Sequence, residues 1–273
     1  KIIGLSDERL SFIKTLVNER IKEDIKDKLG NTQKGSIPER TIDDVHNNIR
    51  AILDYAGERT TDTFIVAIDS KKAFDMINQK MLFATMTRLK VHPKIQSIIQ
   101  ESYREAECTI EINGIRTKDI PVTRGIRQGC PLSMTLYAIA MESLARKIMK
   151  NEKIQGIKIA GRTHKLDQYV DDTTITTRGI QSIGEIFKEY ENYKKATGQE
   201  INEQKTEILP VNGPATKAIT GTPFEKYAGH TVKILGIHYG SKGNQNTYKQ
   251  LKDKIEHRIM NLQERNLTWM GKI

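Results

Sequence analysis

The chain has 273 residues, of which 29% are charged and 37% hydrophobic, and no apolar stretch approaches the roughly 20 residues that a membrane span requires, so we expect no membrane partner. Its two cysteines stand at no metal-binding spacing, which argues against a disulfide framework or a zinc site and favours an intracellular location, cytoplasmic or nuclear. The net charge of +10 and the pI of about 9.4 point towards a polyanionic partner.

Helices and strands are predicted to mix along the chain without regular alternation. Apolar residues at helical spacing predict helices at residues 10–29, 41–53, 78–90, 94–106, 132–149, about 180–197, and 248–263. Strands are expected at 63–69, 206–211 and 232–237, and hairpins at 108–120, turning at Asn113-Gly114, and at 156–177. This order favours an α+β fold with a largely antiparallel sheet.

The predicted strand 63–69 ends in an acid, Asp69, and a second acidic group, Asp171-Asp172, follows Tyr169-Val170 near the turn of the second hairpin. Each could be an ordinary turn acid. If the two strands lie side by side, however, the three carboxylates converge, as a site for two Mg²⁺ ions that catalyses phosphoryl transfer requires. Because successive strand residues face opposite sides, we expect Asp171 to be the firm ligand and Asp172 the weaker one.

Basic residues flank these acids. The segment Arg124–Ser133 combines two arginines and two glycines before a helix, which suits backbone N–H groups that meet an anion. Residues 146–165 carry seven Lys or Arg against one acid, and the tail after Ser241 is also basic. These regions could neutralise a nucleic-acid backbone, although solvated surface lysines are an equally good interpretation of each residue alone.

Taken together, these segments resemble a reverse transcriptase of the non-LTR (LINE-type) retrotransposon group. Seven ordered segments carry the resemblance: 33–40 (a fingers motif), 69–75 (the first palm motif), 124–133, the Tyr-x-Asp-Asp box 169–172, 198–207 (the fourth palm motif), 234–237 (the primer grip) and 267–272 (the thumb). The resemblance implies a right-hand polymerase with partial fingers at 1–60, the palm at 61–240 and the start of the thumb at 241–273, cut from a longer protein.

The resemblance also implies a role for individual residues. Asp69, Asp171 and Asp172 would be the catalytic acids and, with the carbonyl of Ser70, would hold two Mg²⁺ ions. Phe74 would be the steric gate against a ribose 2′-OH. The other residues expected to contact the nucleotide are Arg127, Gln128, Gly129 and Tyr169. Lys205 would assist the departure of pyrophosphate.

Some residues depart from the family pattern. Val170 stands where this group usually has Ala, Met134 replaces a Pro, and Cys130 an often acidic residue; Ser36 replaces an aromatic and Glu39 a Gly in the fingers motif. These changes concern nucleotide and template contacts more than the acids.

The implied reaction is extension of a DNA primer on an RNA template, in which the primer 3′-OH attacks the α-phosphate of a dNTP. Three alternatives stay open: a group II intron or retron enzyme, an RNA-dependent RNA polymerase, which usually has a small or acidic residue at the position of Phe74, and an inactive or domesticated reverse transcriptase-like fragment that only binds nucleic acid.

Overall fold

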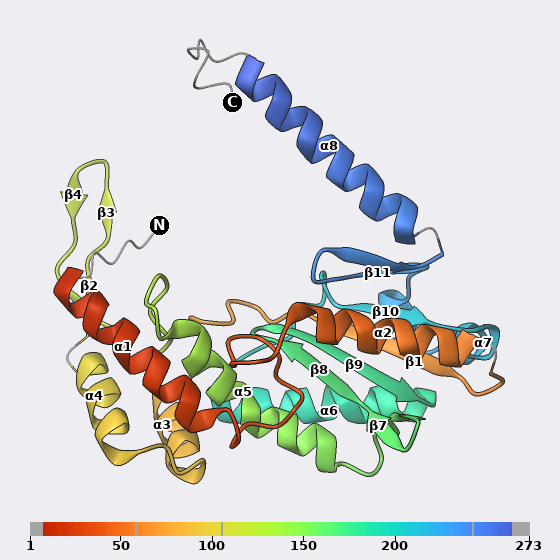
Figure 1. Ribbon diagram of the computed structural model, residues 1–273, viewed down its shortest axis with the longest axis horizontal. Helices are drawn as coiled ribbons and strands as arrows, with labels where there is room; N and C mark the ends of the chain where they lie inside the picture. Colours follow the sequence, from red (N-terminus) through yellow and green to blue (C-terminus); the bar gives the residue numbers. More distant parts are fainter. Residues whose placement is uncertain (1–7, 58, 105, 242, 264–273) are drawn as a thin grey trace.

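The computed structural model describes residues 8–57, 59–104, 106–241 and 243–263. Its centre is an antiparallel four-stranded sheet with the order β10 (Glu207–Pro210), β1 (Thr63–Ile68), β9 (Asp172–Arg178) and β8 (Leu166–Tyr169), shown in Figure 1. The predicted α+β class with a largely antiparallel sheet is therefore confirmed.

Both faces of the sheet are covered, which explains why β1 is apolar at almost every position. On one face, Phe64 and Val66 pack with helices α5 (Ser133–Lys150) and α6 (Ile180–Thr197). On the other, Ile65 packs with helix α2 (Ile42–Gly57) and with the hairpin of β11 (Thr231–Ile234) and β12 (Ile237–Gly240).

The remaining elements lie outside this sheet (Figure 1). They are α1 (Glu8–Ile25), α3 (Gln79–Arg88), α4 (Pro93–Tyr103), β2 (Glu107–Cys108), β3 (Glu111–Ile112), β4 (Ile115–Arg116), β5 (Ile120–Pro121), β6 (Ile157–Ile159), β7 (Arg162–His164), α7 (Gly213–Ile219), a 3₁₀ turn η1 (Glu225–Tyr227) and α8 (Gly243–Gln263). Among the described residues, no helix is both long and apolar enough to cross a membrane.

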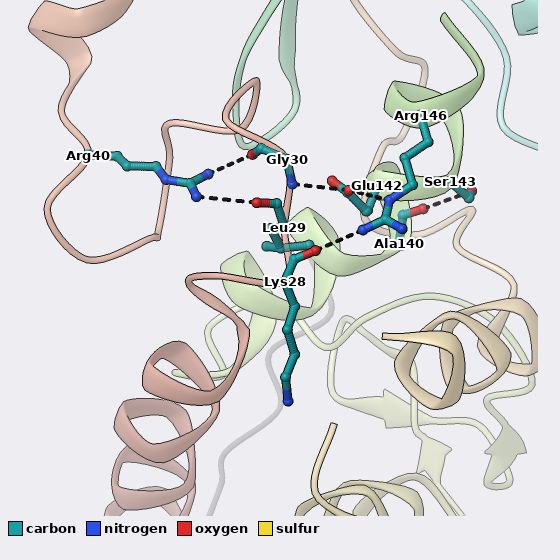
Figure 2. Close-up of polar contacts among 8 residues, drawn as sticks. All are labelled: Lys28, Leu29, Gly30, Arg40, Ala140, Glu142, Ser143 and Arg146. Carbon is teal, nitrogen blue, oxygen red and sulfur yellow. Dashed lines mark hydrogen bonds and ion pairs between the residues drawn. The ribbon is translucent and has the colours of Figure 1, made fainter. Parts of the chain in front are cut away.

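The first helix ends at Ile25, earlier than the predicted 29, because a single arginine organises the backbone that follows. The guanidinium of Arg40 donates hydrogen bonds to four carbonyl oxygens, those of Lys26, Leu29, Gly30 and Gln33, at 2.7–3.3 Å. A helical hydrogen bond from Leu29 N–H to the Ile25 carbonyl, at 2.9 Å, still follows the helix, and the Arg40 bonds then hold residues 26–40, which we call the fingers loop, in a compact conformation. Figure 2 shows the bonds to Leu29 and Gly30.

Two other boundaries differ from the prediction. The expected strand 232–237 is broken at Leu235-Gly236, whose φ angles of 47° and 90° form the tight turn between β11 and β12. The helix expected at 248–263 begins at Gly243 and extends away from the sheet (Figure 1), with its apolar side chains exposed. Helix α7 was not predicted; the side chain of Asn212 caps its start. The predicted thumb segment 267–272 lies outside the described residues.

The fingers loop contains two strained residues, which leads to a stability prediction. Ser36 and Glu39 have φ of 63° and 65°, a region that costs an L residue about 1–2 kcal/mol. Glu39 is exposed, and its ion pair with Lys26 is long at 3.9 Å. We expect Glu39→Gly to raise the free energy of unfolding by about 0.5–1 kcal/mol, net of the greater chain entropy of glycine, in urea denaturation.

Glu39→Ala is the matched control, because it removes the same carboxylate but keeps the β-carbon. It should leave stability unchanged or lower it slightly. Equal stabilities of the Gly and Ala variants would show that the backbone angle is not the cause.

Candidate active site

The register of the central sheet brings the three predicted acids to one end. Ile68 of β1 is opposite Thr173 of β9, so Asp69 follows directly beside the start of β9. Tyr169 of β8 is opposite Asp172, which leaves Val170 and Asp171 as the two-residue turn of this hairpin. The acids therefore come from the end of a buried central strand and from the tip of the adjacent hairpin, as the sequence predicts.

The electrostatics of the two hairpin acids show that the charges are close together. Burial and the neighbouring charge of Asp69 raise the pKa of Asp171 above its usual value. Burial also raises the pKa of Asp172, followed by the charges of Asp171 and Asp69. Each carboxylate is thus held where its ionised form is disfavoured unless a cation compensates it.

Asp69 is fixed by the segment that resembles the fourth palm motif. Asn202 donates its side-chain N–H to Asp69 Oδ2 at 2.9 Å and its backbone N–H to the Asp69 carbonyl at 2.8 Å. Ser70 pairs with Ile201 in an isolated β-bridge. The ammonium of Lys205 lies 3.9 Å from Asp69 Oδ2. Sequence reasoning identified Lys205 but missed Asn202, because only the folded loop shows that this amide points at the acid.

A groove of about 350 Å³ begins at these acids and runs to the β11–β12 turn. Its lining comes from the end of β1, the start of β9, the loop before β10 and the hairpin turn, and includes Asp69, Asp172, Lys205, Lys233 and Leu235. The groove connects the acids with the segment that resembles the primer grip. A larger cavity, of about 480 Å³ between α2 and the start of α8, has none of the three acids in its lining.

Asp171 faces a different neighbourhood from Asp172. Burial raises the pKa of Tyr137 well above its usual value, and the charge of Asp171 contributes to this rise. Tyr137 packs against Phe74 with a ring-centroid distance of 4.8 Å and an angle of 34° between the ring planes. The two adjacent acids therefore divide between two regions: Asp171 is near the aromatic pair, and Asp172 lines the groove. The ranking of Asp171 above Asp172 as a ligand stays a prediction.

The predicted nucleotide-contacting loop, 124–133, is held against the turn that carries Phe74. Ile126 N–H donates to the Phe74 carbonyl at 2.8 Å, and Gln128 Nε2 donates to Asp75 Oδ1 at 3.2 Å. Gln128 and Gly129 are exposed at the surface of this loop. The Arg127 guanidinium instead lies 5.8 Å from the ring centroid of Tyr103 at the end of α4. The structure thus places Gln128 against Asp75, the residue after Phe74, whereas Arg127 faces α4.

Two of the basic residues expected to face a polyanion have a structural role. Lys165 is buried, which lowers its pKa, and its ammonium donates to the carbonyls of Ile148, Met149 and Asn151 at the end of α5. Arg146 binds Glu142 and the Lys28 carbonyl (Figure 2). For Lys165 the expectation of a solvent-facing charge is therefore wrong, since helix carbonyls take all three hydrogen bonds.

The carboxylates of the acidic site suit a divalent cation that binds together with a phosphate-containing substrate. Among the described residues, no three acid, imidazole or thiol groups are close enough to enclose a metal ion. Mg²⁺ usually keeps several waters and is held by one or two carboxylates together with substrate phosphates, so such a cage is not required. Burial and, after it, repulsion between the acids raise the pKa values of Asp171 and Asp172, and a bound cation would offset both effects.

Comparison with known proteins identifies the family of this site. The reverse transcriptase (RNA-dependent DNA polymerase) family profile matches residues 2–239. The chain belongs to the reverse transcriptase family. As for all members of this family, its chemistry implies a divalent metal ion.

This reverse transcriptase has relatives in mobile elements. It is 24% identical over 272 residues, 99% of its length, to the transposon TX1 uncharacterized 149 kDa protein of Xenopus laevis, of which it covers 20%. It is 27% identical over 207 residues, 71% of its length, to the retrovirus-related Pol polyprotein from type-1 retrotransposable element R2 of Nasonia vitripennis, of which it covers 20%. The reverse transcriptase spans about a fifth of the length of these relatives. They confirm the resemblance to the non-LTR group.

Telomerases are among the solved structures with a similar fold. Apo telomerase from Candida tropicalis has a TM-score of 0.60 at 14% identity, over 84% of the reverse transcriptase and 39% of the telomerase chain. Telomerase from Candida albicans in complex with a TWJ fragment of telomeric RNA has a TM-score of 0.55 at 12% identity, over 86% and 36%. At these identities the likeness concerns the fold alone, and it confirms the expected palm with its antiparallel sheet and flanking helices.

Proposed function

We propose that this chain is the polymerase centre of a non-LTR retrotransposable element, which copies an RNA template into DNA by extending a DNA primer with dNTPs. The observation that carries this proposal is the register of β1, β9 and β8, because it gathers Asp69, Asp171 and Asp172 at one end of the sheet in a chain of the reverse transcriptase family. We assign residues 1–60 to partial fingers, 61–240 to the palm and 241–273 to the start of the thumb.

The side chains of this site lie in two regions, to which we assign different roles. Asp172, Lys205 and Leu235 line the groove, whose position beside the acids suits it to hold the primer end. Asp171, Phe74 and Gln128 lie on the side of the aromatic pair and the 124–133 loop, where a nucleotide would bind. Asp69 also lines the groove, and its hydrogen bond from Asn202 holds its carboxylate there. The substrate-contacting roles of Gly129, Arg127 and Tyr169 remain part of this proposal.

Two Mg²⁺ ions held by Asp69, Asp171, Asp172 and the Ser70 carbonyl would supply charge neutralisation on the triphosphate and activation of the primer hydroxyl. The ammonium of Lys205, beside Asp69, can move to a phosphate oxygen and support the departure of pyrophosphate. Phe74, held by its tilted ring contact with Tyr137, would exclude a ribose 2′-OH.

The partners in this proposal are an RNA template, a DNA primer and dNTPs, within the cytoplasm or nucleus and without a membrane. The relatives from retrotransposable elements and the telomerase solved with an RNA fragment support an RNA-directed reaction. The net charge of +10 suits a nucleic-acid partner.

Primer extension on poly(rA)/oligo(dT) by the purified protein tests the proposal. We expect dTTP incorporation that requires Mg²⁺ or Mn²⁺ and stops in EDTA. A protein that binds the primer–template but adds no nucleotide with either metal would instead be a nucleic-acid-binding scaffold. Equal use of rNTPs by the unmodified protein would favour an RNA polymerase.

A further inference from the structure

We propose that Gln33, together with Gly35, is a positioning residue that holds the Tyr169–Asp172 turn in its catalytic conformation from the fingers loop. This inference rests on the proposed function, because it explains how that function keeps Asp171 in place. Both residues lie in the fingers loop, more than a hundred residues before the hairpin in the sequence.

The turn has a backbone conformation that its own sequence does not favour. Val170 has φ of 58°, and the hairpin closes with two residues, so Val170 occupies the first central position of a type II′-like turn. Glycine is the usual residue at that position, and a β-branched residue with positive φ is an outlier. Such a conformation persists only where the surrounding structure imposes it. Asp171 is the next residue, so any relaxation of Val170 moves the carboxylate.

Gln33 supplies that constraint through both ends of its amide. Val170 N–H donates to Gln33 Oε1 at 2.9 Å, and Gln33 Nε2 donates to the Val170 carbonyl at 3.4 Å. The same Oε1 accepts from Gly35 N–H at 3.0 Å. Gln33 is 1% exposed, so water cannot replace these bonds. One buried amide thus satisfies both backbone groups of the strained residue.

Gly35 allows the two segments to come this close. A β-carbon at Gly35 would lie 2.6 Å from the backbone nitrogen of Val170 and 2.6 Å from its Cγ2 atom, closer than atoms can pack. The main chains also pair beside this point: Lys34 N–H donates to the Gln168 carbonyl at 2.7 Å, and Gln168 N–H donates to the Thr32 carbonyl at 2.8 Å. The fingers loop therefore behaves as a short additional strand against β8.

The fingers loop is itself anchored on the side away from the hairpin, so that it can hold Val170 in its strained conformation. Arg40 binds the Gln33 carbonyl at 2.7 Å and three other carbonyls of the loop. Gly30 N–H donates to the buried carboxylate of Glu142 on α5, as Figure 2 shows. Helix α5 is part of the main hydrophobic core. The position of Asp171 is thus connected through Gln33 to the rigid centre of the molecule.

The test compares Gln33→Met and Gly35→Ala with Tyr193→Phe in the purified protein. Methionine keeps the volume of Gln33 but removes both hydrogen bonds, and alanine at 35 pushes on Val170. Tyr193→Phe is the matched control, because it removes a buried hydrogen bond, to the Ala140 carbonyl at 3.2 Å, from the α5–α6 contact. The readouts are single-turnover dTTP addition, its Mg²⁺ dependence, primer–template binding, and hydrogen–deuterium exchange of residues 166–175 in metal-free buffer.

For Gln33→Met and Gly35→Ala we expect the maximal rate to fall by about 10- to 100-fold, the effect that a displacement of about 1 Å at a reacting group can produce. The Mg²⁺ concentration for half-maximal rate should rise, while the KM for dTTP and primer–template affinity stay within about twofold. Exchange at 166–175 should become faster only in these two variants.

The inference is overturned if Gln33→Met keeps the wild-type rate and exchange, or if Tyr193→Phe changes both as strongly, since Gln33 would then have a general structural role. If the unmodified protein adds no nucleotide, the proposed function fails, and the exchange measurement alone still decides whether Gln33 holds the turn.

Discussion

We expect Asp171→Asn to reduce Mg²⁺-dependent primer extension by at least about 10³-fold, because the loss of a charged ligand removes several kcal/mol of electrostatic stabilisation from the transition state. The amide fits the same volume, so the fold and the affinity for primer–template should change little. Asp69→Asn should have a similar effect, with the added loss of the Lys205 ion pair. Single-turnover extension and fluorescence anisotropy with labelled primer–template measure the two quantities.

Asp167→Asn is the control on the same hairpin. Asp167 lies in β8, is 6% exposed, and accepts a hydrogen bond from Asn48 Nδ2 of α2 at 2.8 Å. Burial raises its pKa, so a neutral residue is tolerated there, and we expect activity within about threefold of wild type, as for substitutions that leave the reacting groups untouched. If Asp171→Asn kept more than about a tenth of wild-type activity, Asp171 would not be a ligand of the catalytic metal.

The acidic site could be predicted from the sequence because its parts obey local rules. The sequence shows an apolar run that ends in Asp69 and two acids on a predicted hairpin turn. The prediction that these acids converge needs only one further assumption, that the strands are neighbours. The register of β1 with β9 supplies that assumption. The Asn113-Gly114 hairpin was predictable for the same reason: both residues have positive φ, which their side chains tolerate or favour.

The parts that could not be predicted depend on long-range contacts. Nothing near Gln33 in the sequence indicates that its amide satisfies Val170, since 137 positions separate the two residues. The end of α1 depends on Arg40, whose guanidinium donates hydrogen bonds to the carbonyls of residues that have helical propensity. The sequence suggests that Lys165 is a surface charge, yet its ammonium donates a hydrogen bond to a carbonyl at the end of α5. In each case a tertiary hydrogen bond overrides a local pattern.

The second large expected effect is on the selection of deoxyribonucleotides over ribonucleotides. We expect Phe74→Ala to lower the preference for dTTP over UTP by about 10- to 200-fold, the range over which a pocket discriminates by size alone. The ring of Phe74 can act as a gate because it cannot swing away. It packs at a tilt against the ring of Tyr137, and Tyr137 is itself fully buried and hydrogen-bonded to Gln199 at 2.7 Å. The measurement is competitive incorporation of the two nucleotides on poly(rA)/oligo(dT).

Phe83→Ala separates this effect from a loss of packing. Phe83 is also half-buried and contacts a tyrosine, Tyr103, edge-on at 6.3 Å, but it lies in α3, outside the two regions assigned to primer and nucleotide. Both alanine variants should lose stability, since each removes a partly buried ring and its aromatic contact. Only Phe74→Ala should admit UTP, because Phe83 lies outside the region proposed to bind the nucleotide. If both variants, or neither, changed the preference, the sugar would be selected elsewhere, and the rigid Phe74–Tyr137 pair would serve to support Asp171 alone.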